Sequence, residues 1–133
     1  MVVVRANVLP GAFEYVIAGH PAPVFLPLGG PTRLVTGAGF PIGMIDNAVF
    51  EEERLTMEPG DRLYCYTDGV IEALNAAEEE YGIDRLMFEI DRSRDLPLRT
   101  GLDAIARSVR DWCGGRLRDD VSLLGVERAA RPE

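Results

Sequence analysis

The hydrophobic pattern of this chain changes its period once, and that change limits the folds open to it. Up to Tyr66 the apolar residues come in short runs rich in β-branched side chains, which is typical of strands. After Asp68 they recur at i, i+3, i+4 and i+7, which is the stripe of an amphipathic helix. A block of strands, then helices, then one closing strand predicts an α+β fold with a largely antiparallel sheet.

The expected strands are Val2–Val8, Phe13–Ala18, Val24–Leu28, Arg33–Thr36, Val49–Met57, Arg62–Tyr66 and Val121–Val126. The first two should form a hairpin around a turn at residues 9–11, and Arg62–Tyr66 is apolar enough to be a central strand. Helical stripes start near Val70, Ile83 and Leu102, and Gly114-Gly115 ends the last of them. Helices gathered mostly after the strands would leave one sheet face without an obvious cover.

The charge of the chain narrows the classes of function. Its 133 residues fit one domain, and 14 basic residues, all arginine, stand against 22 acidic ones, for a net charge of −8. A net negative domain repels a phosphate backbone, so we expect no nucleic-acid partner. We also expect no membrane span, because no apolar run approaches the ~18 residues required. The N-terminus has no signal-peptide pattern, which favours a cytoplasmic protein.

An acidic surface is compatible with solubility, with a basic partner protein, or with carboxylates gathered around metal ions. The cysteines do not favour zinc, because there is no CxxC pair and the chain has one histidine. We interpret Cys65 and Cys113 as buried thiols in a reducing compartment. The runs Glu51-Glu52-Glu53 and Glu78-Glu79-Glu80 read as solvated faces.

One candidate site residue follows the expected central strand. Asp68 comes directly after Tyr66-Thr67, and Gly69 then lets the chain turn sharply. A carboxylate in this place is held by a rigid element and points beyond the sheet edge. The alternative is that Asp68 is the N-cap of the helix that starts near Val70.

A second candidate precedes the closing strand. Asp119 and Asp120 are adjacent carboxylates, which repel each other unless a cation or an arginine is close. Alone, the pair also fits a solvated turn. If the strands beside Asp68 and Asp119 are neighbours, both carboxylates can converge on one site, and oxygen ligands of this kind suit Mg²⁺ or Mn²⁺.

A third candidate is the histidine His20, which follows a glycine and precedes a proline at the end of an expected strand. A lone histidine is more often a structural hydrogen-bonding group than a ligand. The glycines of residues 37–43 precede no helix and carry no Gly-Lys-Ser/Thr ending, so they do not form a phosphate-binding loop.

Taken in order, five segments resemble one known family: AGHPAP, GFPIG, LTMEPGDRLYCYTDGVIEALN, EEEYGIDRL and RDDVSLLGV. They are similar to the C-terminal half of bacterial metal-dependent serine/threonine phosphatases of the SpoIIE type, within the PPM or type 2C-like superfamily. The resemblance runs from about Val2 to Glu127, so we expect residues 1–128 to belong to this domain and 129–133 to be a disordered tail. The usual member has a glycine-glutamate pair where this chain has Ala77-Glu78-Glu79-Glu80.

The resemblance implies a four-layer α-β-β-α sandwich of antiparallel sheets with a two-metal site, for Mn²⁺ or Mg²⁺, at one edge. It also implies that Asp68 and Asp119 are metal ligands and the catalytic residues. Gly69 would permit close approach of the backbone to the metals, and Glu72 would be a candidate ligand for a weaker third ion. His20 would lie near the same site.

The activity implied is hydrolysis of phosphoserine or phosphothreonine by a metal-activated water. The phosphoprotein substrate would be an anti-sigma-factor antagonist of a partner-switching system. The family's N-terminal half carries an aspartate segment and Gly-His-Gly, which this sequence lacks. We therefore expect a fragment that lacks the N-terminal half and is inactive alone. Two alternatives are a non-catalytic phosphatase-like binding module and a homodimer through the uncovered sheet face.

Overall fold

The computed structural model describes residues 2–7 and 11–130. The strands are β1 (Val2–Asn7), β2 (Ala12–Ile17), β3 (Val24–Leu26), β4 (Arg33–Leu34), β5 (Glu53–Thr56), β6 (Arg62–Tyr66) and β7 (Leu123–Glu127). The helices α1 (Asp68–Ile71), α2 (Gly82–Arg92) and α3 (Leu98–Trp112) lie between β6 and β7. This order confirms the α+β prediction.

The strands form two antiparallel sheets, as the family resemblance implies, whereas the order of elements alone suggests one sheet. The first sheet has the order β1-β2-β5, and the second has the order β4-β3-β6-β7. The expected hairpin is confirmed, since β1 pairs with β2 from Val2↔Ile17 to Asn7↔Ala12. The strand β6 lies between β3 and β7, as expected for a central strand.

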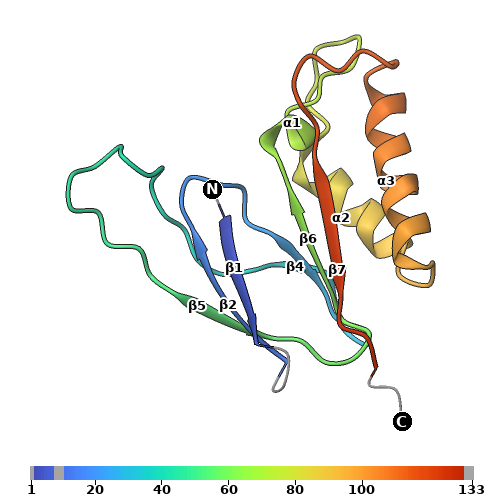
Figure 1. Ribbon diagram of the computed structural model, residues 1–133. Coiled ribbons are helices and arrows are strands. Elements are labelled where there is room, and N and C mark those ends of the chain that lie inside the picture. The colour runs from blue at the N-terminus through green and yellow to red at the C-terminus, as the bar shows by residue number, and fades with distance from the viewer. Residues whose placement is uncertain (1, 8–10, 131–133) are drawn as a thin grey trace.

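The two sheets and the helices are arranged as consecutive layers (Figure 1). The helices α2 and α3 cover one face of the second sheet, and the first sheet lies on its other side. Side chains alternate accordingly: Val24 and Tyr64 pack with the helices, whereas Phe25 and Leu63 pack with the first sheet. Within the described residues, no helix covers the outer face of the first sheet, so the β-β-α part of the expected sandwich is present.

Two clusters of buried side chains hold these layers together. The helix-side core lies between the second sheet and the helices; its buried members are Val24, Leu26, Tyr64, Tyr66, Val70, Ala73, Tyr81, Leu86, Ile90, Ile105, Val109 and Cys113. The inter-sheet core lies between the sheets; its buried members are Tyr15, Ile17, Phe25, Val35, Leu55, Met57 and Leu63. Apolar burial of this kind is the main favourable term in folding.

The largest difference from the sequence prediction lies between β4 and β5. The strand expected over Val49–Met57 begins only at Glu53, and β4 is two residues long. The connecting segment contains Gly37, Gly39 and Gly43, and at Gly39 its backbone packs directly against the end of β2. The amide of Gly19 donates to the carbonyl of Gly39 at 2.7 Å, and a Cβ at Gly39 would come within 2.2 Å of the carbonyl oxygen of Ile17. Glycine lets the backbones approach this closely.

Some expectations lie outside the described residues. They are the end of the first strand at Val8, the turn residues 9 and 10, and residues 131–133 of the expected tail. Both cysteines are free, as expected; Cys113 is buried as predicted, but the prediction of burial is wrong for Cys65, which is half-buried. In the part of the chain that the structure describes, no helix is long and apolar enough to cross a membrane.

Candidate active site

The pairing of β6 with β7 brings the two candidate aspartates to the same edge of the second sheet. The strands are antiparallel, with Tyr66 opposite Leu123, so the end of β6 meets the start of β7. Asp68 follows the end of β6, and Asp119 precedes the start of β7. The condition set by the sequence, that these two strands be neighbours, is therefore met.

Thr67 ties this junction together with its backbone and its side chain. Its amide donates to the carbonyl of Ser122 at 3.1 Å, and its hydroxyl donates to the carbonyl of Asp120 at 3.1 Å. The amide of Ser122 donates to the same hydroxyl at 3.0 Å. Thr67 was not among the predicted site residues; the signal for it in the sequence was a small hydroxyl residue between the central strand and Asp68. These bonds fix the 120–122 backbone against the end of β6.

Gly69 lets the loop before β7 lie directly on the first turn of α1. A Cβ at Gly69 would be 2.4 Å from the carbonyl oxygen of Asp120 and 3.5 Å from the Cβ of Asp119. The first distance is shorter than any real contact, so only glycine fits without a shift of backbone. The side chain of Asp119 therefore lies beside Gly69 of α1, and Gly69 is the residue that follows Asp68 in the chain.

The alternative that Asp68 is an N-cap is wrong. Asp68 is the first residue of α1, and Thr67 is the N-cap, with no side-chain capping bond. One oxygen of Asp68 accepts the amide of Gly69 at 3.0 Å, and one oxygen of Asp119 accepts the amide of Asp120 at 2.8 Å. Both side chains are exposed, and among the described residues neither second carboxylate oxygen has a hydrogen-bond partner.

A cavity of about 160 Å³ opens at this junction. Three of the predicted site residues line it, namely Gly69, Glu72 and Asp119. The other lining residues are Ala73, Leu74, Leu117 and Arg118. Glu72 follows α1, and its amide donates to the carbonyl of Asp68 at 2.9 Å. The structure thus brings Gly69, Glu72 and Asp119 to one hollow, with Asp68 beside it in the chain.

His20 lies in the connection between β2 and β3, not in the lining of this cavity. Its Nδ1 is 2.8 Å from the carbonyl oxygen of Pro21. The same connection is fastened to the second sheet, because the hydroxyl of Tyr66 donates to the carbonyl of Ala22 at 2.9 Å. The structural interpretation of His20, as a hydrogen-bonding group, agrees with this geometry.

The carboxylates at this junction are of the type that binds a divalent metal ion, but they are too few to complete its ligand set. Asp68, Glu72 and Asp119 offer exposed carboxylate oxygens, which are the ligands that Mg²⁺ and Mn²⁺ prefer. In the described part of the chain, no group of three or more histidine, cysteine, aspartate or glutamate side chains is placed to hold a metal ion. These residues can therefore supply part of a metal's ligand set.

Residues 1–129 match the family model described as Stage II sporulation protein E (SpoIIE). Protein IcfG of Synechocystis sp. is 29% identical over 119 residues, which are 89% of this chain and 19% of IcfG. The phosphoserine phosphatase RsbP of Bacillus subtilis is 36% identical over 59 residues, which are 44% of this chain and 15% of RsbP. The chain thus spans less than a fifth of the length of these curated relatives.

The fold is also that of a known phosphatase domain. The Mn-presoaked structure of the phosphatase domain of the cell fate determinant SpoIIE from Bacillus subtilis superimposes with a TM-score of 0.79 at 14% identity. The match covers 100% of this chain and 58% of that one. At this identity the likeness concerns the fold, whereas the family rests on the match over residues 1–129. The chain belongs to the SpoIIE family.

Proposed function

We propose that the protein is a metal-dependent phosphatase of phosphoserine and phosphothreonine, and that Asp68 and Asp119 are metal ligands in its active site. The observation that carries this proposal is the contact of Gly69 with residues 119 and 120, which sets the two aspartates at one sheet edge. Membership of the SpoIIE family and the phosphoserine phosphatase activity in the name of RsbP support it.

In this proposal each residue has a defined task. Asp68 and Asp119 present their second carboxylate oxygens to the metal, and Glu72 presents a carboxylate for a more weakly held ion. Thr67 and Gly69 fix the distance between the two carboxylate-bearing segments. A bound Mn²⁺ or Mg²⁺ would lower the pKa of a coordinated water and neutralise charge on the phosphoryl oxygens.

A cysteine nucleophile is a poor competitor for water in this site. Burial raises the pKa of the Cys65 thiol above its usual range, so the reactive thiolate is disfavoured. Cys65 also lies within β6, where it pairs with Leu124, rather than at the sheet edge. We therefore assign the attack on phosphorus to water. The free thiols of Cys65 and Cys113 fit a reducing compartment such as the cytoplasm.

The substrate class that we propose is a phosphoprotein of the anti-sigma-factor antagonist type, switched between partners by its phosphorylation. A folded protein substrate fits an active site at an exposed sheet edge, because the candidate ligands Asp68, Glu72 and Asp119 are all exposed. A deep cleft for a small metabolite would instead enclose its ligands.

The decisive experiment compares two adjacent aspartates in the full-length protein. Asp119→Asn should lower Mn²⁺-dependent hydrolysis of para-nitrophenyl phosphate and of a phosphoserine peptide by about 100-fold, since it removes a ligand. Asp120→Asn is the matched control and should leave the rate nearly unchanged. Asp68→Asn should behave like Asp119→Asn. Full activity in Asp68→Asn would refute the assignment.

Within the described residues, no group of three or more histidine, cysteine, aspartate or glutamate side chains is placed to hold a metal ion, which favours a second candidate: a phosphatase-like module that binds a partner without catalysis. Titration calorimetry with Mn²⁺ separates the two, since a binding module gives no metal-dependent heat.

A homodimer through the outer face of the first sheet stays a prediction. That face carries the ion pair of Glu14 and Arg54 at 2.8 Å, and light scattering would measure the mass.

A further inference from the structure

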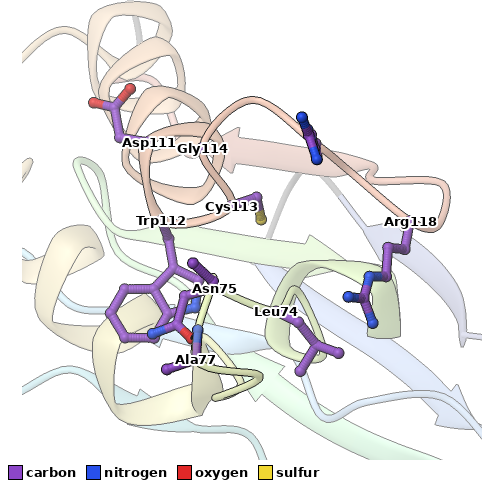
Figure 2. A pocket seen from close by; sticks show the side chains of 10 residues that line it. Leu74, Asn75, Ala77, Asp111, Trp112, Cys113, Gly114 and Arg118 are labelled. Atoms are coloured by element: carbon purple, nitrogen blue, oxygen red, sulfur yellow. The ribbon is translucent and has the colours of Figure 1, made fainter.

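A second and larger cavity lies next to the candidate active site, and Figure 2 shows the side chains that line it. Its volume is about 890 Å³, and residues of the α1–α2 connection, the end of α3 and the loop before β7 surround it. It shares Leu74 and Arg118 with the small cavity that contains Asp119. A peptide whose phosphate reaches Asp119 would therefore place its neighbouring residues at this second cavity.

The walls of the larger cavity are held in place before any ligand arrives. The indole NH of Trp112 donates to the carbonyl of Glu79 at 3.1 Å, and the guanidinium of Arg85 lies 4.0 Å from the centre of the indole ring. The side-chain oxygen of Asn75 accepts the amides of Ala77 and Glu79, each at 2.9 Å. A preorganised wall reduces the entropy lost on binding.

The charged groups at this cavity favour an acidic ligand, although the chain as a whole has a net charge of −8. Arg116 and Arg118 both line it, and Asp111 is the single acidic residue among its lining residues. Figure 2 shows the Asp111 carboxylate turned away at the far rim, whereas the Arg118 guanidinium extends toward Leu74. Two guanidinium groups that line one cavity match carboxylate oxygens in charge and hydrogen-bonding capacity.

Arg118 can exchange its present partner for a ligand. Its guanidinium is 3.1 Å from a carboxylate oxygen of Glu78, and these side chains are 66% and 71% exposed. An ion pair so exposed contributes little to stability. Within the described residues, no ion pair involves Arg116, which is exposed as well. Both arginines are therefore free to bind an incoming carboxylate.

We propose that this cavity docks acidic side chains that flank the phosphoserine or phosphothreonine of the substrate, with Arg116 and Arg118 as the specificity-determining residues. The proposal rests on the phosphatase function above, because it places the phosphate at the metal site that Asp68 and Asp119 would hold. Arg116 lines the larger cavity alone, away from the reacting phosphate, so it should set the affinity for the substrate and not the rate of the chemical step, whereas Arg118 lines both cavities.

The test uses the full-length protein and a labelled phosphoserine peptide with glutamates on both sides of the phosphoserine. The comparison peptide carries glutamines instead. In fluorescence anisotropy, wild type should bind the glutamate peptide about tenfold more tightly than the glutamine peptide, and Arg116→Gln with Arg118→Gln should abolish that difference. In hydrolysis, Arg116→Gln alone should raise KM for the glutamate peptide with kcat unchanged, because Arg116 does not line the cavity that contains Asp119.

Arg116 lines the larger cavity and not the small one that contains Asp119, so Arg116→Gln alone should hydrolyse para-nitrophenyl phosphate, which carries no flanking carboxylates, as fast as wild type. Arg107→Gln is the matched control, since Arg107 is exposed on α3 and lines a different hollow with Asp103 and Arg110. Equal affinity of wild type for the two peptides would overturn the docking site. A preference for the glutamate peptide without any phosphatase activity would support the docking site and refute the proposed function.

Discussion

Large apolar side chains are buried in the helix-side core but exposed in the loop between β4 and β5. In the core, Leu86 and Ile90 of α2 are fully buried against the second sheet. In the loop, by contrast, large apolar side chains stay exposed, namely Phe40, Ile42, Met44, Ile45, Val49 and Phe50. The exposed side chains of the loop are large and apolar like those buried in the core, so the type of side chain does not explain the difference.

The difference comes from backbone regularity. The helix α2 repeats its apolar residues with the period of its own backbone, so one stripe faces the sheet. The loop contains glycines with positive φ at Gly37 and Gly43, and no strand or helix forms over residues 36–52. Without a regular element the apolar side chains have no common face to bury. Burial thus depends on a periodic backbone as much as on apolar residues.

The largest effect on stability should come from a large-to-small substitution in the helix-side core, compared with one in the inter-sheet core. Leu86→Ala should lower the free energy of unfolding by about 3 kcal/mol, because it leaves a cavity in a site with no solvent access. Leu55→Ala, on the edge strand β5, should cost about 2 kcal/mol, since the sheet edge can relax around it. Urea denaturation measures both. A larger loss for Leu55→Ala would place the stability of the fold in the inter-sheet core.

Alkaline pH should weaken the helix-side core through Tyr66. Burial, with a smaller contribution from the charge of Cys65, raises the pKa of Tyr66 to about 12. An unfolded tyrosine ionises near pH ~10, so the stabilisation is complete below ~10 and is lost as the pH rises toward about 12. The loss should be on the order of 2 kcal/mol.

The control for this pH effect is Tyr66→Phe, which has no phenol to ionise. It should lose the bond to the carbonyl of Ala22 at every pH, at a cost of about 1 kcal/mol, and show a flatter decline above pH ~10. Denaturant unfolding of wild type and variant at pH ~9 and pH ~11 gives the difference. Parallel declines in the two proteins would assign the alkaline sensitivity to other groups.

The smallest effect should come from the exposed loop. Val49→Ser replaces a side chain that is 88% exposed, so the free energy of unfolding should change by less than about 0.5 kcal/mol. Ile42→Ser, at 61% exposure, is a second variant of the same kind. Thermal unfolding is sufficient to measure both. A loss comparable to that of Leu86→Ala would mean that the loop is packed in solution, and the comparison would fail.

The sequence by itself determined the order of elements and most of their positions. The strand Arg62–Tyr66 has the predicted bounds, and the helices follow the predicted stripes, because periodicity is a property of one segment and needs no partner. The positions of Asp68 and Asp119 beside strands could be predicted for the same reason, because each strand was recognised from its own residues. Their roles as metal ligands stay a proposal.

Only the tertiary structure decided how these segments meet. It set the strand orders β1-β2-β5 and β4-β3-β6-β7. It placed the hydroxyl of Thr67 in a hydrogen bond to the carbonyl of Asp120, and brought that carbonyl so close to Gly69 that no Cβ fits there. It also buried Arg62, whose guanidinium donates to Glu127 at 2.6 Å and to the carbonyl of Leu96 at 2.7 Å. Each of these facts joins residues far apart in the chain, and local patterns carry no information on such pairs.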